Sequence, residues 1–185
     1  MTGEAQLAFP LAGLLGEDPG TQQAWDFEGV TIATPDALVL GEPISGTLRV
    51  TRTNRGVYVA ARIRTSIRGE CARCLRATLT RIDTRIEEEA LPVTDLASGA
   101  AIDPAAEPDV LRLDDHHELD LAPLAVDAIS LAEPIAPLCE PECPGLCTTC
   151  GERLDTAHAG HADDPIDPRL AALLGFRVDG ETENE

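Results

Sequence analysis

Six cysteines, gathered in two places, constrain the fold more than any other feature of this sequence. Cys71 and Cys74 form one C-x-x-C pair, and the segment 139–150 holds the other four cysteines, ending in a second pair at Cys147 and Cys150. Two residues between cysteines let a turn aim both sulfurs at one ion, and structural zinc takes four ligands. A chain that uses both pairs for one ion must bring these two places together.

The six thiols allow more than one set of zinc ligands. The preferred set joins the two C-x-x-C pairs, because two such turns from distant points give a tetrahedral all-thiolate site. The local competitor uses the four cysteines of 139–150 alone, and two histidines further along could replace a thiolate. The preferred ligands are Cys71, Cys74, Cys147 and Cys150, and the alternates are Cys139, Cys143, His158 and His161.

The expected zinc is structural. Four thiolates leave no open coordination position for a substrate or a reacting water. A thioredoxin-like redox pair is the competing interpretation, but no βαβ pattern surrounds either C-x-x-C pair. The spacing also matches neither ferredoxin pattern for iron–sulfur clusters. We therefore expect a zinc-stabilised protein that is not an enzyme.

The chain lacks the sequence signals of a membrane or secreted protein. No stretch approaches the roughly 18 uninterrupted apolar residues that a membrane-spanning helix needs. The apolar run at 7–16 follows an acidic residue, Glu4, and contains Pro10, so a secretory signal is not expected. We expect a cytoplasmic protein that makes no membrane contact, in a compartment where reduced thiols favour metal sites over disulfides.

Alternation of side-chain character predicts β-strands between residues 44 and 93. Runs at 44–52 and 57–68 flank a turn signal, Thr53-Asn54-Arg55-Gly56, which predicts a hairpin. In the second run the odd-numbered residues are apolar or threonine and the even-numbered residues include three arginines, so one face is core and the other is solvated. A third strand at 75–93, with a bulge near 80–81, would complete an antiparallel meander.

The flanking segments are less regular. Residues 1–36 indicate an irregular lead-in, and the acidic, Ala/Pro-rich segment 94–118 indicates a flexible linker with a short strand around 110–113. Beyond it, Asp120 can cap a helix whose leucines and alanines recur at helical spacing until Glu133.

These elements predict one α+β domain over residues 37–178. Its expected architecture is an antiparallel β meander with one main helix and a zinc-knuckle C-terminal segment, in which 168–176 suggests a short helix. Residues 179–185 would then be a disordered acidic tail.

The charge of the chain is unevenly distributed. The net charge is −19, yet ten of the 14 basic residues, all arginines, lie between Arg49 and Arg85, where only two acids reduce the local charge to +8. Arginine forks bind phosphate bidentately, so an arginine-bearing strand face beside a metal site predicts contact with the phosphate backbone of a nucleic acid. Alternatively, these arginines only neutralise the chain's own acids. The candidate RNA-binding residues are Arg62, Arg64, Arg68, Arg73 and Arg76.

Four segments together resemble the YceD family of bacterial and plastid proteins. They occur in family order over roughly residues 45–176 and read IRTSIRGECARCLRATLT, LDLAPLAVDAISLAEPIAPLC, CPGLCTTCGERLD and IDPRLAALLGF. The resemblance implies a role in ribosome biogenesis, with large-subunit ribosomal RNA or a pre-ribosomal particle as partner, and supplies no reaction. A second hypothesis, from charge, is an adaptor whose acidic segments engage a basic ribosomal protein or an assembly factor.

Overall fold

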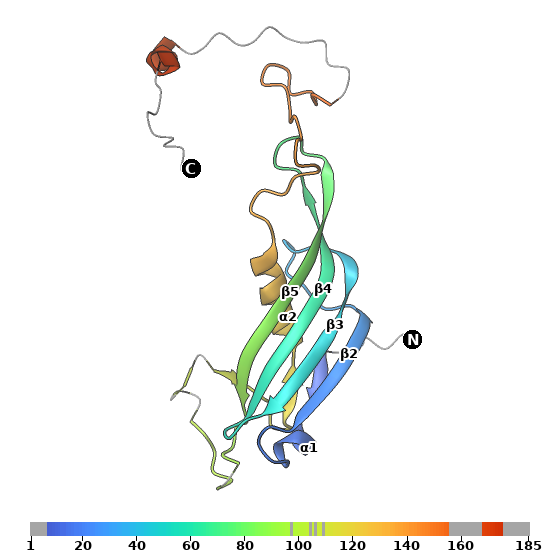
Figure 1. The fold of residues 1–185 in the computed structure, drawn as a ribbon, viewed down its shortest axis with the longest axis vertical. Coiled ribbons are helices and arrows are strands. Elements are labelled where there is room, and N and C mark those ends of the chain that lie inside the picture. Colours follow the sequence, from blue (N-terminus) through green and yellow to red (C-terminus); the bar gives the residue numbers. More distant parts are fainter. Residues whose placement is uncertain are drawn as a thin grey trace, which may run out of the picture.

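A five-stranded sheet forms the body of the protein (Figure 1). The computed structural model describes residues 7–96, 98–103, 105, 107–108, 110–155 and 168–175. In sheet order the strands are β2 (Gln22–Val30), β3 (Leu40–Arg52), β4 (Val57–Glu70), β5 (Ala77–Leu91) and β6 (Leu111–Arg112). β2 to β5 form an antiparallel meander, and β6 adds to β5 in parallel. The predicted α+β class, the hairpin and the short strand near 110–113 are confirmed.

The predicted irregular lead-in at residues 1–36 is wrong for much of its length. It contains β1 (Ala8–Pro10), the short helix α1 (Ala12–Leu15) and the edge strand β2. β1 pairs with β7 (Glu118–Asp120) in a separate two-stranded sheet. Leu7, Phe9 and Leu11, in and beside β1, are part of the hydrophobic core. β2 escaped the prediction because its apolar alternation is short: Trp25 and Phe27 pack against the core, whereas most of its other side chains are exposed.

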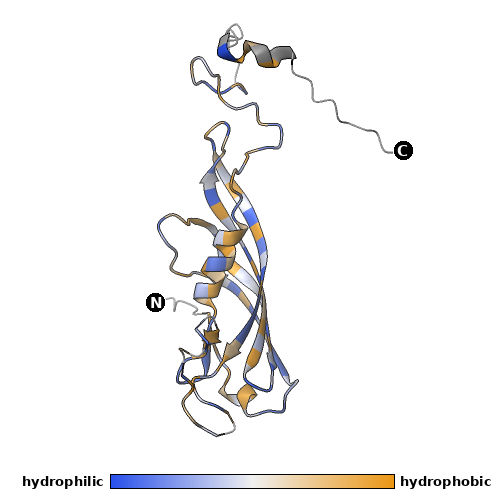
Figure 2. Cartoon of the chain, turned by 90° about the vertical axis from the view of Figure 1, so that its left-hand side faces the viewer, coloured by the Kyte–Doolittle hydropathy of each residue, from blue (hydrophilic) through white to orange (hydrophobic). Residues whose placement is uncertain are grey.

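The hydrophobic core lies against one face of the meander. From Val57 to Ile67 the odd-numbered side chains of β4 are all buried, which confirms the predicted core face. The main helix, α2 (Ala122–Ala132), lies along one side of the sheet (Figure 2) and buries Ala125 and Ile129. Full burial of an aliphatic side chain contributes about 1.5–3 kcal/mol, so this face supplies the main folding energy of the body.

β4 and β5 continue beyond the other strands as a two-stranded ribbon. Their register is uninterrupted from Val57–Ala90 to Glu70–Ala77, so the predicted bulge near residues 80–81 is wrong. The apolar pattern shifts there because the ribbon has left the core, and Leu79 is 55% exposed. Isolated two-stranded ribbons are marginally stable in water, so the end of this ribbon needs further support.

The C-terminal part adds one short helical element, η2 (Pro168–Gly175). Among the described residues, no helix combines the length and the apolar character needed to cross a membrane. The predicted acidic tail at 179–185 lies outside the described residues.

Candidate metal centre and arginine surface

The ribbon ends in a tight turn, Cys71–Arg76, which we call the first knuckle. Its first amide donates to the carbonyl of the sixth residue at 2.7 Å, and the amide of the fifth residue, Leu75, donates back to Cys71 at 2.9 Å. Leu75 has a φ of 57°, a left-handed conformation that costs a non-glycine residue energy. The first knuckle is thus a closed turn that presents both of its thiols together.

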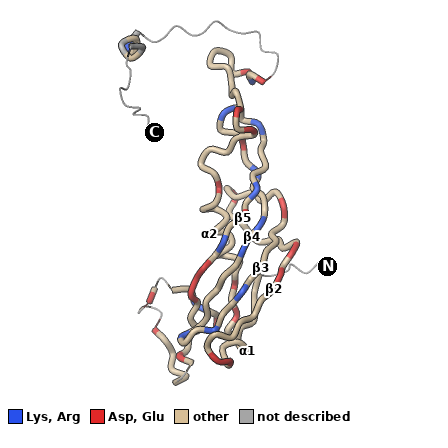
Figure 3. Tube along the Cα trace, in the orientation of Figure 1, with Lys and Arg blue, Asp and Glu red and all other residues tan. Residues whose placement is uncertain are grey.

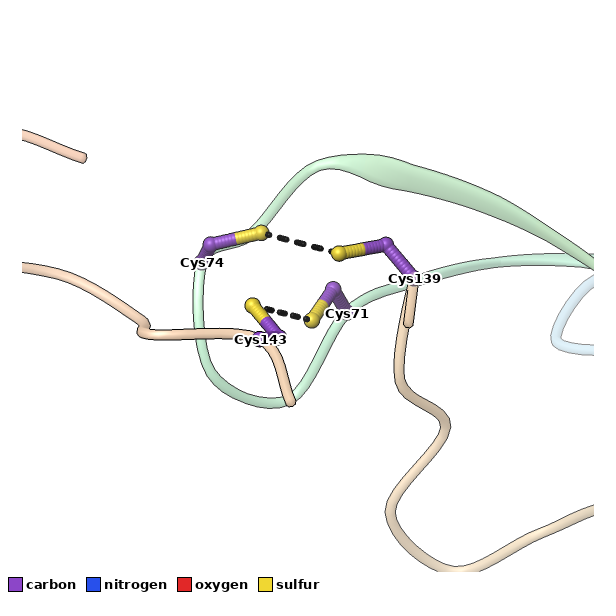
Figure 4. A group of neighbouring side chains, drawn as sticks. All are labelled: Cys71, Cys74, Cys139 and Cys143. Carbon is purple, nitrogen blue, oxygen red and sulfur yellow. Dashed lines mark hydrogen bonds between the residues drawn. The ribbon is translucent and has the colours of Figure 1, made fainter. Parts of the chain in front are cut away.

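Four thiols meet at the first knuckle (Figure 4). The amide of Ala72 donates to the carbonyl of Pro137 at 2.8 Å, which holds the segment after α2 against the turn. That segment brings two further cysteines, so that four sulfurs lie within 4.8 Å of one another. The cluster consists of Cys71, Cys74, Cys139 and Cys143.

The spacing of these sulfurs fits a tetrahedral metal ion. The Sγ atoms of Cys71 and Cys143 are 3.7 Å apart, and those of Cys74 and Cys139 are 3.6 Å apart. Zinc–sulfur bonds of about 2.3 Å place the corners of a tetrahedron about 3.8 Å apart. A disulfide would require about 2.05 Å, and all six cysteines are free thiols. The cluster can therefore hold a metal with all four ligands from this chain.

The structure groups Cys71 and Cys74, the first half of the preferred ligand set, with two of the alternates. Cys147 and Cys150 lie in a separate turn, and the alternates Cys139 and Cys143 occupy the places predicted for them. The cause is the docking of the chain at Pro137, which brings the first cysteines of the 139–150 segment to the knuckle. The alternates His158 and His161 lie outside the described residues.

The thiols of the cluster are electrostatically unequal. Burial acts to raise the pKa of Cys71, but backbone amides from Cys139, Cys74 and Arg73 outweigh it and lower that pKa to about 6. Burial, assisted by neighbouring thiols, raises the pKa of Cys139 to about 12. One thiolate therefore forms readily, whereas complete deprotonation requires a compensating positive charge such as a bound metal ion.

Arginine side chains form hydrogen bonds between the first knuckle and the segment that follows α2. Arg73 donates from Nη1 to the carbonyl oxygen of Cys143 at 2.9 Å, and Arg153 donates from Nε to the carbonyl oxygen of Cys74 at 3.1 Å. Arg76 forms an ion pair with Asp155. Two of the predicted RNA-binding residues, Arg73 and Arg76, thus contact the protein itself and stabilise the turn.

The remaining candidates lie on the solvent-exposed face of the meander, which we call the outer face. Arg62 donates through Nε and Nη2 to the two carboxylate oxygens of Asp83, both at 2.6 Å. This hydrogen bonding is the largest cause of the lowered pKa of Asp83. Arg64 approaches the same carboxylate at 3.8 Å, whereas Arg68 forms no ion pair among the described residues. Arg62 is therefore already neutralised, while Arg64 and Arg68 are more available to a ligand.

The sheet register places three further arginines on the outer face, in addition to the five candidate residues. Arg85 lies opposite Arg62, and Arg81 lies opposite Ser66 on the same face. Arg49, on β3, is opposite Ala60. All three side chains are exposed, and arginine positions follow β3 to β5 toward the knuckle (Figure 3). Alternation within each strand carries this signal, but only the register shows that the three strands share the face.

A comparison with protein-family models identifies the family of this chain. A family model described as "Large ribosomal RNA subunit accumulation protein YceD" matches residues 59–177. The chain belongs to the YceD family. The matched part of the YceD chain includes most of β4, the first knuckle, α2 and all six cysteines. The description of the family supports a ribosome-related role.

Curated relatives extend the family to mycobacteria without adding a function. An uncharacterized protein of Mycobacterium tuberculosis is 35% identical over 127 residues, or 69% of this chain. An uncharacterized protein of Mycobacterium leprae is 33% identical over 134 residues, or 72% of this chain. The matched regions span 58% of the length of each relative. No solved structure matches this YceD chain.

Proposed function

We propose that this protein is a non-enzymatic, zinc-stabilised factor that supports the accumulation of large-subunit ribosomal RNA. It binds the RNA or a precursor particle through arginines of the outer face. The observation that carries the proposal is the shared exposure of arginines from three adjacent strands in a member of a family described by ribosomal RNA accumulation. Because arginine pairs with phosphate bidentately, such a face suits the RNA backbone.

The part of the outer face next to the ribbon is the best candidate for contact. Arg64 and Arg68 on β4 and Arg81 on β5 are exposed there. Further along the same face, Asp26, Glu87 and Glu89 add negative charge, which repels phosphate. RNA contact is therefore concentrated near the ribbon, and it follows the backbone rather than the base sequence, since aromatic platforms for stacking are scarce in this chain.

Zinc is the metal that best suits the cysteine cluster. Four thiolates in tetrahedral geometry select zinc or an iron–sulfur cluster, and the cysteine spacing departs from the ferredoxin patterns. When bound, zinc supplies the positive charge that four thiolates require and joins the ribbon to the segment after α2. Its role is to hold the end of the arginine-bearing ribbon in one conformation.

The RNA hypothesis is tested by the salt dependence of binding. Filter binding of purified large-subunit ribosomal RNA is measured between low and moderate salt for the wild type and for Arg64→Gln, Arg68→Gln and Arg81→Gln. Each lost phosphate contact should reduce the slope of log K against log salt by about 0.7–0.9.

Arg55→Gln is the matched control, because it removes the same charge at the opposite end of β4, where Arg55 pairs with Glu107. Its slope should equal that of the wild type. Two results would contradict the proposal: wild-type slopes in Arg64→Gln, Arg68→Gln and Arg81→Gln, or no RNA retention even at low salt.

The acidic part of β5 favours a second candidate function, an adaptor for a basic ribosomal protein. Glu87, Glu88 and Glu89 are consecutive and all exposed, and such a cluster attracts a basic partner. Replacing the three by glutamine should then abolish capture of a basic ribosomal protein and leave RNA retention unchanged. The converse result favours direct RNA binding.

A further inference from the structure

The turn Cys147–Glu152, which we call the second knuckle, repeats the backbone of the first. Its first amide donates to the carbonyl of the sixth residue at 2.7 Å, and the amide of the fifth residue donates to the carbonyl of the first at 2.9 Å. Both distances equal those of the first knuckle, Cys71–Arg76. The fifth residue is left-handed in both turns, with a φ of 57° at Leu75 and 74° at Gly151. Two segments far apart in the chain thus build one conformation.

This turn conformation directs backbone amides toward cysteine sulfur, which favours metal binding. The amide of Thr149 approaches Sγ of Cys147 at 3.4 Å, and amides directed at sulfur favour the thiolate form that metals bind. At the first knuckle the same turn presents two of the four clustered thiols, although Leu75 must adopt a costly left-handed conformation to complete it. Gly151 adopts that conformation without the cost.

The second knuckle is closed by backbone contacts between its own flanking residues. An isolated bridge pairs Leu146 with Arg153, and the amide of Leu154 donates to the carbonyl of Gly145 at 3.1 Å. Cys147 is only 9% exposed. The thiols of this turn do not belong to the first cluster, whose four sulfurs already complete a tetrahedral set.

We propose that Cys147 and Cys150 bind a second metal ion of the thiolate-preferring class to which zinc belongs, so that each chain carries two metal ions. The two thiolates occupy half of a tetrahedral site, and donors outside the turn complete it. The inference depends on the geometry of the turn and is independent of any RNA-binding role, so each can fail without the other.

Zinc content per chain tests the proposal directly. Purified protein is analysed by elemental mass spectrometry as wild type, as Cys71→Ser/Cys74→Ser and as Cys147→Ser/Cys150→Ser. The wild type should contain two zinc ions, and each double variant should contain one. One zinc in the wild type, retained in Cys147→Ser/Cys150→Ser, would overturn the proposal, as would a Cys147–Cys150 disulfide in freshly purified, zinc-loaded protein.

Two substitutions at Gly151 keep both thiols and change only how well the chain adopts the turn. They therefore test the geometry of the turn without removing a ligand. Gly151→Val places a β-branched residue in a left-handed conformation and should weaken the second zinc roughly 5- to 30-fold in chelator competition. Gly151→Asn, which tolerates that conformation, should bind nearly as tightly as the wild type. Equal affinity for zinc in the valine variant and the wild type would contradict the proposal.

Discussion

The body and the tip of this protein are held together by different forces. The body, the meander with α2, surrounds a continuous core of aliphatic side chains. The tip, which comprises the first knuckle and residues 137–147, has a buried cluster of three cysteines, and among the described residues the only partly buried hydrophobic side chains that pack against it are those of Cys139 and Leu146. Hydrophobic burial can therefore account for the body, whereas we propose that a metal ion bound by the clustered thiols stabilises the tip.

The comparison shows that one sheet can supply part of the core and also carry an exposed arginine face. β4 and β5 are anchored in the core at one end and reach the cysteine cluster at the other, with the exposed arginines between them. A metal at the tip would stabilise the free end of the ribbon without contributing to the core. The two regions should consequently respond to different perturbations.

The largest expected effect is the loss of the first metal. Cys71→Ser removes one of four thiolates and should release zinc from that cluster, since structural zinc in small domains contributes about 10–16 kcal/mol of apparent binding energy. Zinc content and thermal unfolding measure the outcome, and the melting temperature of the body should change little. Leu75→Gly, which retains every thiol, should keep the metal. A Cys71→Ser protein with full zinc content would refute the assignment.

A core substitution should have the opposite effect: it should destabilise the body and leave the metal site unchanged. Ile63 is fully buried in β4, so Ile63→Ala should lower the free energy of unfolding of the body by about 2–5 kcal/mol and leave the zinc content unchanged. Ile135→Ala is the matched control, because Ile135 is fully exposed and its truncation should cost less than about 0.5 kcal/mol. Denaturant unfolding measures both. Equal destabilisation by the two changes would show that the core lies elsewhere.

The smallest effect concerns the ion pair of Arg62 and Asp83. Hydrogen bonding to Arg62 lowers the pKa of Asp83 in the folded protein, so the contribution of this pair to stability is present above the ordinary aspartate pKa and is lost as the pH falls through the folded-state value. Arg62→Gln should raise the pKa of Asp83 toward its ordinary range, as followed by carboxyl NMR titration. Arg85→Gln should produce a smaller rise. An unchanged Asp83 titration in Arg62→Gln would show that the pair does not persist in solution.

The regular part of the fold was predictable because alternation reports burial directly. In β4 every odd-numbered residue from Val57 to Ile67 is apolar or threonine and is buried, so strand and face could both be inferred. β2 gave a weaker signal, because in this edge strand only Trp25 and Phe27 alternate with acidic residues and most other side chains are exposed. The prediction of a bulge near residues 80–81 was wrong because it treated Leu79 as a core residue. Leu79 is exposed on the ribbon, where an apolar side chain does not indicate the inner face.

The place of Cys71 and Cys74 in a thiol cluster was predictable, whereas the identity of the two cysteines that join them was not. The C-x-x-C spacing correctly indicated a thiol cluster at Cys71 and Cys74. The choice of Cys139 and Cys143 depends on a backbone hydrogen bond between Ala72 and Pro137, which no side-chain pattern encodes. In the same way, the sequence showed that arginines were concentrated in one segment, but the pairing of Arg62 with Asp83 required the strand register.

Hydrogen exchange with and without a zinc chelator tests the central contrast most directly. Amides of residues 69–78 and 137–147 should lose protection when metal is removed, while amides of β4 and β5 within the body, at 57–67 and 82–90, should keep theirs. Loss of protection in both regions together, or in neither, would contradict the account of a hydrophobic body that carries a metal-dependent tip.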